Sequence, residues 1–321
     1  MQRSLAGPCR NLCIVLFCLC ASSHAAYPER PIRMIIAATA GSGPDILARQ
    51  IGAKLTEAWG QQIVVDARPG ATGVVGAEMV AKAAPDGYTL WFATMTQLIG
   101  TTMYQRYMMS KDFAPIGMVA STAFAIAVNS TLPVNNIAEL IAYAKARPGQ
   151  LLYGSSGQGS TSHLCIEMFR SVSGINVQHI PYRGVVPSIT DLMGGQVQLS
   201  CQAVPSLPTF EKTGRLRSLG VTTLTRTIIA PNVPPIAETL PGFEILGWYG
   251  MLAPLRTPKE LIQKINGAVM QALKTAEVQE KLIALGAEAA GSSPEAYGTF
   301  LKKETDRWAR LLREANIKPT E

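Results

Sequence analysis

The chain has 321 residues, a hydrophobic share of 47% and a formal net charge of +7. A chain of this length exceeds what one hydrophobic core usually organises, so we expect two domains. Its basic residues form no run interleaved with aromatic residues, which make up only 7% of the chain, and this argues against a nucleic-acid partner.

The first 25 residues have the pattern of a secretory signal peptide. Two arginines precede an apolar run over residues 12–21, which is shorter than the about 20 residues that a membrane span needs. Ser23 and Ala25 place small residues before the expected cleavage point, so we expect cleavage after Ala25 and a periplasmic mature chain. A lipoprotein anchor is the competing interpretation, but neither Cys18 nor Cys20 follows the small residues of a lipobox.

Four of the six cysteines lie in this segment, which leaves Cys165 and Cys201 for the mature chain. One disulfide between them is possible in an oxidising compartment. Two separate small buried residues are the alternative. No Cys-x-x-Cys pattern or His/Cys spacing points to a metal, so we expect neither a metal nor a cofactor.

Strands and helices alternate from residue 31 to about residue 124. We expect strands over residues 32–38, 63–66 and 89–94, and helices over residues 44–59 and 74–82. Pro44 suits the first position of a helix, and Asp45 suits the positive end of its dipole. Such alternation predicts an α/β layer with a mostly parallel sheet.

A second αβ series begins near Ala125. We expect helices over residues 137–147, 161–172 and 187–193, strands over 151–153, 177–181 and 198–203, then a strand over 244–252 and helices over 259–285 and 294–315. With no third strand-rich unit to cover, the late helices should pack on the first unit. The expected domains are therefore 26–124 with 223–321, and 125–222, joined by a hinge.

Three glycine-rich loops, at residues 40–45, 68–73 and 154–161, each follow a predicted strand and lead into a helix. Backbone amides at the positive end of a helix dipole can hold an anion. Because ligands prefer the crevice between domains at the carboxyl ends of strands, we expect the loops to face one cleft. An ordinary tight turn that needs positive φ is the alternative for the third loop, residues 154–161.

Nucleotide and hydrolase motifs are incomplete. Ile46 stands where a dinucleotide fingerprint needs its third glycine, and Ser160 stands where a P-loop needs lysine. Ser160, His163 and Asp191 could form a triad, but no G-x-S-x-G elbow accompanies them. We therefore expect no enzyme and no catalytic residues.

Four side chains near the loops are candidates for specific roles. Arg183 could pair with a ligand carboxylate or form a surface salt bridge. His163 is expected to donate a hydrogen bond, either to a ligand or to the neighbouring loop. Among the others, we expect His179 to be structural and Arg68 to brace its own loop.

Many ordered stretches between residues 27 and 318 match a known family. The most specific are 68–77, 85–90, 144–149, 153–164, 179–184, 191–197 and 248–250. On these residues the chain resembles the Bug family of periplasmic solute-binding proteins, the TctC-like receptors of tripartite tricarboxylate transporters. The resemblance implies an α/β, type II periplasmic-binding fold, whose two domains are joined by a hinge and close like a flytrap on a small organic acid.

The resemblance also implies which residues bind the ligand. In the family, a ligand carboxylate is held largely by backbone amides and waters. Carried onto this chain, the binding residues are Thr39, Ala40, Gly41, Ser42, Ala71, Thr72, Gly73, Ser155, Ser156, Gly159, Ser160 and Thr161, with His163, Arg183 and Asp191 close to the cleft.

The first loop departs from the family pattern. The usual Pro-Phe-Ala-Pro-Gly-Gly is replaced by Ala-Ala-Thr-Ala-Gly-Ser over residues 37–42. Loss of the aromatic residue at Ala38 should reshape the pocket, and Thr39 and Ser42 add hydroxyls. The resemblance therefore predicts the fold but does not transfer the identity of the ligand.

These features predict a monomeric periplasmic binding protein that captures a small mono- or dicarboxylate. It would deliver this ligand to the membrane permease of a tripartite tricarboxylate transporter. The alternative is a receptor that presents the ligand to a membrane sensor kinase, and a hydrolase that uses Ser160 and His163 is a third, less favoured, hypothesis.

Overall fold

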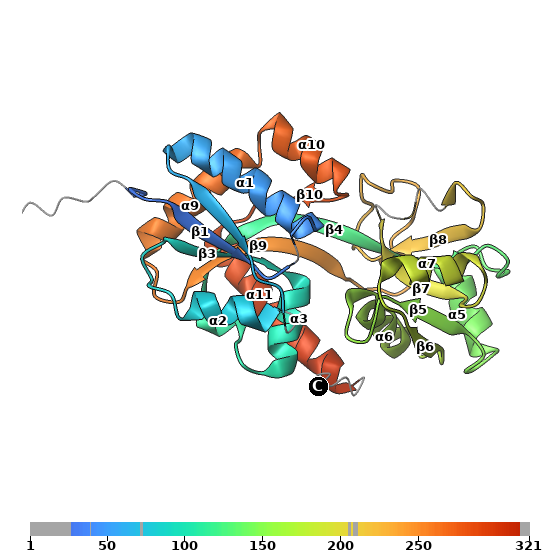
Figure 1. Cartoon of the computed structure of the whole chain (residues 1–321). Helices are drawn as coiled ribbons and strands as arrows, with labels where there is room; N and C mark the ends of the chain where they lie inside the picture. Colours follow the sequence, from blue (N-terminus) through green and yellow to red (C-terminus); the bar gives the residue numbers. More distant parts are fainter. Residues whose placement is uncertain (1–26, 39, 71–72, 205–206, 208–210, 315–321) are drawn as a thin grey trace, which may run out of the picture.

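The computed structural model describes residues 27–38, 40–70, 73–204, 207 and 211–314. Figure 1 shows two lobes joined side by side, with both ends of the described chain in the first lobe. The expected signal peptide and the predicted ligand residues Thr39, Ala71 and Thr72 lie outside the described residues. None of the described helices is both long and apolar enough to cross a membrane.

The first lobe is built on a sheet with the strand order β2-β1-β3-β9-β4. Its strands are β1 (Ile32–Ile36), β2 (Ile63–Ala67), β3 (Thr89–Thr94), β9 (Leu246–Pro254) and β4 (Phe113–Asn129), with the short β10 (Glu288–Ala289) beside β4. Strands β2 and β3 run parallel to β1, whereas β9 runs antiparallel to β3 and β4. The parallel part places the carboxyl ends of β1, β2 and β3 at one edge of the sheet.

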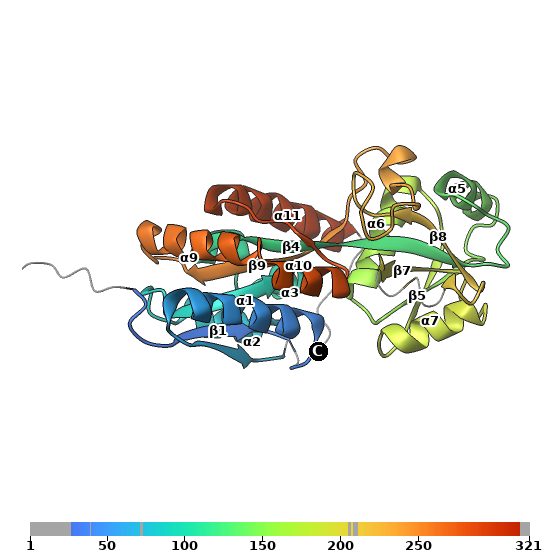
Figure 2. The same cartoon turned by 90° about the horizontal axis from the view of Figure 1, so that it is seen from above.

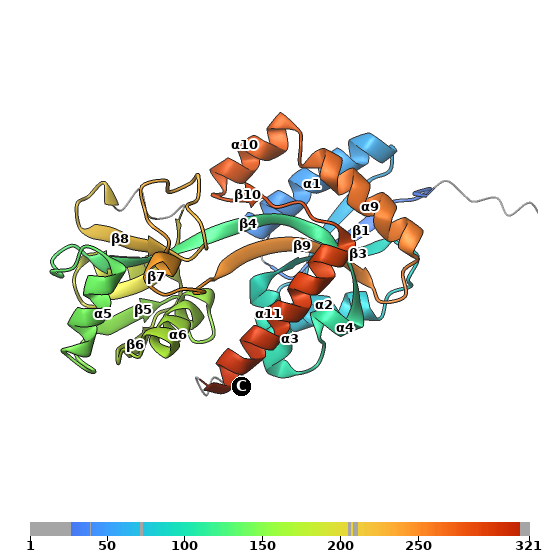
Figure 3. The same cartoon turned by 180° about the vertical axis from the view of Figure 1, so that it is seen from behind.

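Helices cover both faces of this sheet (Figures 1 and 3). One face carries α1 (Gly43–Trp59), α9 (Lys259–Ala272) and α10 (Ala276–Ala284), and the other carries α2 (Val74–Ala81), α3 (Met95–Tyr104), α4 (Met109–Asp112) and α11 (Pro294–Glu314). Along β1, Met34 faces the α1 core while Ile35 faces the α11 core. Burial on both faces explains why β1 is apolar at every position except Arg33, whose side chain is partly exposed.

The second lobe repeats the layered arrangement on a smaller scale. Its strands are β5 (Leu152–Ser155), β6 (Gln178–Pro181), β7 (Leu199–Ala203) and β8 (Leu216–Val221), and its helices are α5 (Ile137–Lys145), α6 (Thr161–Ser173) and α7 (Val185–Met193). Strand β5 is parallel to both β6 and β7. Figure 2 shows α5 and α6 on one side of this sheet and α7 on the other.

Strand β4 belongs to both lobes. Its first part pairs with β9, whereas the part from Phe124 onward pairs with β7 and β8. The return connection passes through the buried Thr222, whose amide donates to the Phe124 carbonyl at 2.8 Å and whose hydroxyl donates to the Ile245 carbonyl at 2.6 Å. Thr222 therefore joins the two strands that pass between the lobes.

Several elements differ from the sequence-based prediction. The single helix expected over residues 259–285 is two helices, because the Thr275 hydroxyl donates back to the Ala272 carbonyl while the Thr275 carbonyl starts α10. Helices α3 and α4 and strands β8 and β10 were not predicted. Strand β9 begins at Leu246, two residues later than the predicted start.

The structure joins Cys165 and Cys201 in a disulfide, which resolves the two alternatives left open by the sequence. Cys165 lies on α6 and Cys201 on β7, and both are fully buried. The bond therefore fixes the start of α6 to the central sheet of the second lobe.

We expect the paired substitution Cys165→Ala with Cys201→Ala to lower the free energy of unfolding by about 2 to 4 kcal/mol, because the bond closes a loop of 36 residues in the unfolded chain. Urea unfolding of the oxidised wild type and the double variant measures the difference. Dithiothreitol should destabilise the wild type by a similar amount and leave the double variant unchanged. Equal unfolding of the wild type with and without dithiothreitol would contradict the prediction.

Candidate functional site

A cavity of about 440 Å³ lies where the two lobes meet, at the N-terminus of α6. The described residues that line it are Thr96 from α3, Phe124 from β4, Ser156, Ser160, Thr161 and Ser162 from the loop after β5 and the start of α6, Val185 from α7, and Cys201, Gln202 and Ala203 from β7. None of these lining residues is charged. The volume is in the range of small-molecule sites.

The third glycine-rich loop forms much of the cavity wall and satisfies its own polar groups. The Ser156 amide donates to the Ser162 hydroxyl at 2.9 Å, and the Ser160 hydroxyl donates to the Gly157 carbonyl at 2.6 Å. Gly157 and Gly159 have φ values of +131° and +72°, so the loop needs glycine at both positions. The hydroxyls are thereby fixed before any ligand arrives.

The first amides of α6 are available at this wall. Ser160 is the N-cap, and its hydroxyl accepts from the amide of His163 in the first turn. No described residue accepts a hydrogen bond from the amides of Thr161 and Ser162. Because both residues line the cavity, the positive end of the α6 dipole is directed toward it.

His163 supports this loop from behind. Its Nδ1 atom accepts a hydrogen bond from the Gly159 amide at 3.0 Å, and its ring stacks on His179 with 4.0 Å between centroids. The prediction that His163 donates to the loop is therefore wrong in direction, because the ring nitrogen accepts the bond. His163 is buried and is not among the residues that line the cavity.

His179 holds the other side of the same loop. Its Nε2 atom is 2.6 Å from the Ser155 hydroxyl, and its ring also stacks on Tyr153. Burial lowers the pKa of His163, and burial together with the neighbouring His163 lowers the pKa of His179 to about 4. Both rings are therefore neutral at physiological pH, as the bond to Nδ1 of His163 requires.

The first two glycine-rich loops lie at the carboxyl ends of β1 and β2, the sheet edge at which β3 leads into α3 and Thr96. The Gly41 amide donates to the buried Asp45 carboxylate at 2.9 Å, and the Gly73 amide donates to the Gly70 carbonyl at 2.9 Å. The predicted residues Ala40, Gly41, Ser42 and Gly73 do not line the cavity in this arrangement.

The remaining predicted side chains have other positions. Arg183 is exposed in the turn between β6 and α7, with no ion pair to a described residue. Asp191 accepts a hydrogen bond from the Tyr182 hydroxyl at 2.7 Å. Arg68 braces its loop, as expected, through an ion pair with Asp66 at 2.8 Å.

The cavity thus brings together three predicted residues, Ser156, Ser160 and Thr161. Sequence reasoning missed Ser162, although it lies beside them in the same motif. It also missed Thr96, Phe124, Val185, Gln202 and Ala203, and it did not assign Cys201 to the site. A usable signal existed for Ser162, which continues the Gly/Ser-rich stretch, whereas the other residues come from separate elements.

Ser160 and His163 do not form a catalytic pair. The Ser160 hydroxyl donates to the Gly157 carbonyl, and Nδ1 of His163 accepts from the Gly159 amide. The Ser160 hydroxyl and Nδ1 of His163 are therefore bonded to the loop backbone rather than to each other.

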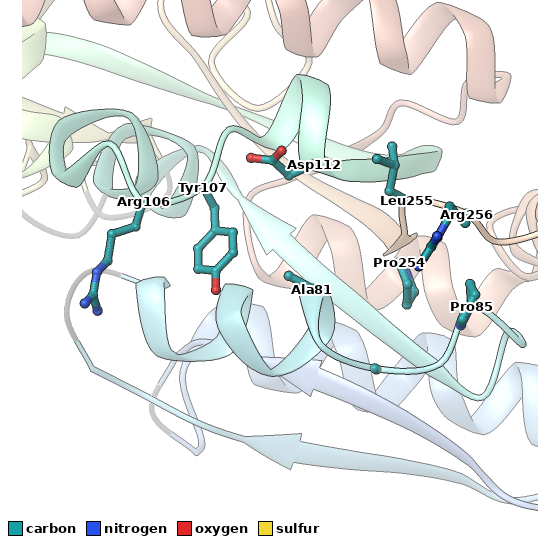
Figure 4. A pocket seen from close by; sticks show the side chains of 9 residues that line it. Ala81, Pro85, Arg106, Tyr107, Asp112, Pro254, Leu255 and Arg256 are labelled. Carbon is teal, nitrogen blue, oxygen red and sulfur yellow. The ribbon is translucent and has the colours of Figure 1, made fainter.

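A second cavity, of about 510 Å³, lies at the opposite end of the first lobe (Figure 4). Figure 4 shows the Arg106 guanidinium directed away from Arg256, with Tyr107 on the same side of the cavity as Arg106. Its cationic side chains do not converge on one point, and it contains none of the predicted ligand residues. The interlobe cavity is therefore the stronger candidate.

Comparison with known proteins agrees with this architecture. Residues 47–317 match the family described as "Tripartite tricarboxylate transporter family receptor". The chain belongs to this receptor family. A UPF0065 protein from the tcbD-tcbE intergenic region of Pseudomonas sp. (strain P51) is 35% identical over 296 residues, 91% of this chain and 88% of that protein. Protein BugT of Bordetella pertussis is 33% identical over 297 residues, 91% of each chain.

Solved structures of the family share the fold of this receptor. Rpa4515 of R. palustris with adipate is 35% identical, with a TM-score of 0.73 over 92% of this chain and 100% of that one. MatC from Rhodopseudomonas palustris with bound malate is 26% identical, with a TM-score of 0.71 over 89% and 100% of the two chains. A TctC solute binding protein from Polaromonas without ligand is 27% identical, with a TM-score of 0.83 over 90% and 99%.

These relationships establish the broad class of the receptor. It is a periplasmic solute-binding protein of the Bug type with a two-domain α/β fold. Its family and structural neighbours are binding proteins rather than enzymes.

We expect the receptor to lose stability between pH 7 and pH 5. The pKa values of both histidines are lower in the folded state than the unfolded value of about 6.5, so the unfolded state binds more protons as the pH falls. The stabilisation is complete above about pH 6.5 and is lost toward about pH 4.

Urea midpoints of the mature receptor at pH 7 and pH 5 measure this loss. The only other histidine, His24, lies in the expected signal peptide, so no third histidine contributes in the mature receptor. His179→Gln, whose amide can replace Nε2, should show a smaller loss between the two pH values. A wild-type midpoint that is the same at both pH values would refute the prediction.

Proposed function

We propose that this receptor binds a small mono- or dicarboxylate at the N-terminus of α6 and closes its lobes around it. The observation that carries the proposal is the cavity wall, in which the Thr161 and Ser162 amides have no acceptor among the described residues, the serine hydroxyls are fixed, and no described lining residue is acidic. Such a wall offers donors and a helix dipole to an anion.

Neutral donors are sufficient for a useful affinity. A hydrogen bond to a charged group contributes about 1.5 to 3 kcal/mol, and micromolar binding needs about 8 kcal/mol. Three or four such bonds, together with contact between the ligand's carbon chain and Phe124 or Val185, reach this value. The structural neighbours described with adipate and with malate support a carboxylate as the ligand class.

Lobe closure is the second part of the proposal. The halves that move are residues 26–124 with 223–321, and residues 125–222, so closure brings the first two glycine-rich loops toward the cavity. Thr39, Ala40, Gly41, Ser42, Ala71, Thr72 and Gly73 then complete the site. The Polaromonas protein without ligand has a higher TM-score to this chain than the protein with adipate, although its sequence identity is lower. This difference supports an open arrangement of the lobes in this receptor.

The predicted side chains outside the cavity have supporting roles in this proposal. Ser155, Gly159 and His163 hold the third loop, and Asp191 holds Tyr182 beside it. Arg183, exposed near the cleft, pairs with a second carboxylate where the ligand has one. The receptor is exported as a monomer after cleavage behind Ala25 and delivers its ligand to a tripartite transporter permease, a partner suggested by the family description.

We expect small carboxylates to raise the melting temperature of the mature receptor, because a ligand at 100 times its dissociation constant adds about 2.7 kcal/mol of stability. A thermal-shift screen of mono- and dicarboxylates, each paired with its amide, measures the effect. The amides should give little shift, since they lack the charge that the α6 amides stabilise. Equal shifts from acids and amides would disprove carboxylate recognition, and an unchanged radius of gyration in X-ray scattering would disprove closure.

Removal of one cavity hydroxyl should weaken binding without unfolding the receptor. Thr161→Val keeps the shape of the side chain, and we expect it to raise the dissociation constant of the best carboxylate about tenfold. Calorimetric titration measures the change, and Thr190→Val, on the exposed face of α7, is the matched control. An unaltered affinity in Thr161→Val would remove this hydroxyl from the site.

A further inference from the structure

We infer that Gln202 makes this receptor selective for carboxylates that also carry an O–H or N–H donor. The inference rests on the proposed function, because it concerns the same interlobe cavity. It narrows the ligand class to hydroxy-, amino- or amido-carboxylates.

Gln202 lies in the cavity wall with only 2% of its surface exposed. Its Nε2 atom donates to the Ser200 hydroxyl at 2.7 Å, and that hydroxyl donates to the Gly154 carbonyl at 2.7 Å. These bonds connect the side chain to β5, the strand that leads into the third glycine-rich loop.

This chain of bonds fixes the orientation of the Gln202 amide. A carbonyl can only accept, so the single proton of the Ser200 hydroxyl is used by Gly154. Ser200 can then only accept from Gln202, which requires the amide nitrogen to face Ser200. No described residue donates to Oε1 of Gln202, so this acceptor is open to a donor from the cavity that Gln202 lines.

An oriented acceptor in a buried wall discriminates between ligands. A hydroxyl or amine on the ligand can donate to Oε1, whereas a plain methylene leaves this polar atom without a partner when the lobes close. A second ligand carboxylate placed there is repelled by the carbonyl dipole. The α6 amides thus recognise the charge of the ligand, whereas Gln202 recognises its donor group.

The donor requirement separates two types of carboxylate. Ionised adipate has no O–H or N–H group, whereas malate carries a hydroxyl beside one of its carboxylates. We therefore expect this receptor to prefer the malate type, although it shares more sequence identity with the neighbour described with adipate.

The test compares malate with succinate, which differ by one hydroxyl, in calorimetric titrations of the mature receptor. We expect the wild type to bind malate about tenfold to a hundredfold more tightly than succinate. Gln202→Met, which keeps the length but removes the acceptor, should bring this ratio close to one by weakening malate. Gln178→Met, at an exposed position on β6, should leave the ratio unchanged.

A second variant tests the orientation without changing Gln202. Ser200→Ala releases the amide, which can then turn its nitrogen toward the cavity, so the ratio of malate to succinate affinity should fall. An unchanged ratio in both Gln202→Met and Ser200→Ala, or a wild type that binds the two acids equally, would overturn the inference while leaving the proposed function intact. Failure of the wild type to bind any carboxylate would instead overturn the proposed function.

Discussion

The two-lobed structure depends on one strand that is shared by two sheets. Strand β4 pairs with β9 in the first lobe and continues directly into pairs with β7 and β8 in the second. The backbone hydrogen bonds of this strand cannot be broken to move one lobe, so any closure must twist the strand near Phe124. Thr222 donates hydrogen bonds to the carbonyls of Phe124 and Ile245 where the chain passes between the lobes. Phe124 itself lines the cavity. A hinge at this level would therefore belong to the same strand as part of the cavity wall.

The cavity wall depends on neutral histidines. The Gly159 amide donates to His163, and this bond exists only while Nδ1 carries no proton. Burial lowers the pKa of both rings, and the neighbouring His163 further opposes protonation of His179. Because the disulfide also fixes α6 to β7, the amides and hydroxyls of the loop are held in position before a ligand binds.

Much of the fold could be predicted because hydrophobic periodicity reports burial. The strands β1, β2 and β3, the helices α1 and α2, and the packing of the late helices on the first lobe all follow from that pattern. Helix α3 was missed because it begins directly after β3, where a Thr94 and Gln97 capping box replaces a glycine or proline signal. The break between α9 and α10 was missed for a similar reason, since Thr275 ends the helix with a side-chain bond.

The site was harder to predict than the fold. The third loop was found because glycines and serines cluster in sequence, but Thr96, Phe124 and Gln202 come from three separate elements. Their meeting depends on β4 crossing between the lobes and on the position at which α3 begins. The direction of the His163 bond was also inaccessible, because a sequence shows which residues can donate but not which atom faces which.

The position of the α6 amides constrains how a ligand can drive closure. These amides belong to the second lobe, so contacts with them alone bind the open and closed states equally and cannot shift the equilibrium between them. A ligand shifts that equilibrium only through additional contacts in the closed state, which must come from the first lobe. Thr96 is a described first-lobe residue already at the cavity, and it lies on the sheet edge that also carries the first two glycine-rich loops. On the proposed function, affinity for the anion and the drive to close would therefore be separable properties, the first residing in α6 and the second at the edge formed by β1, β2 and β3.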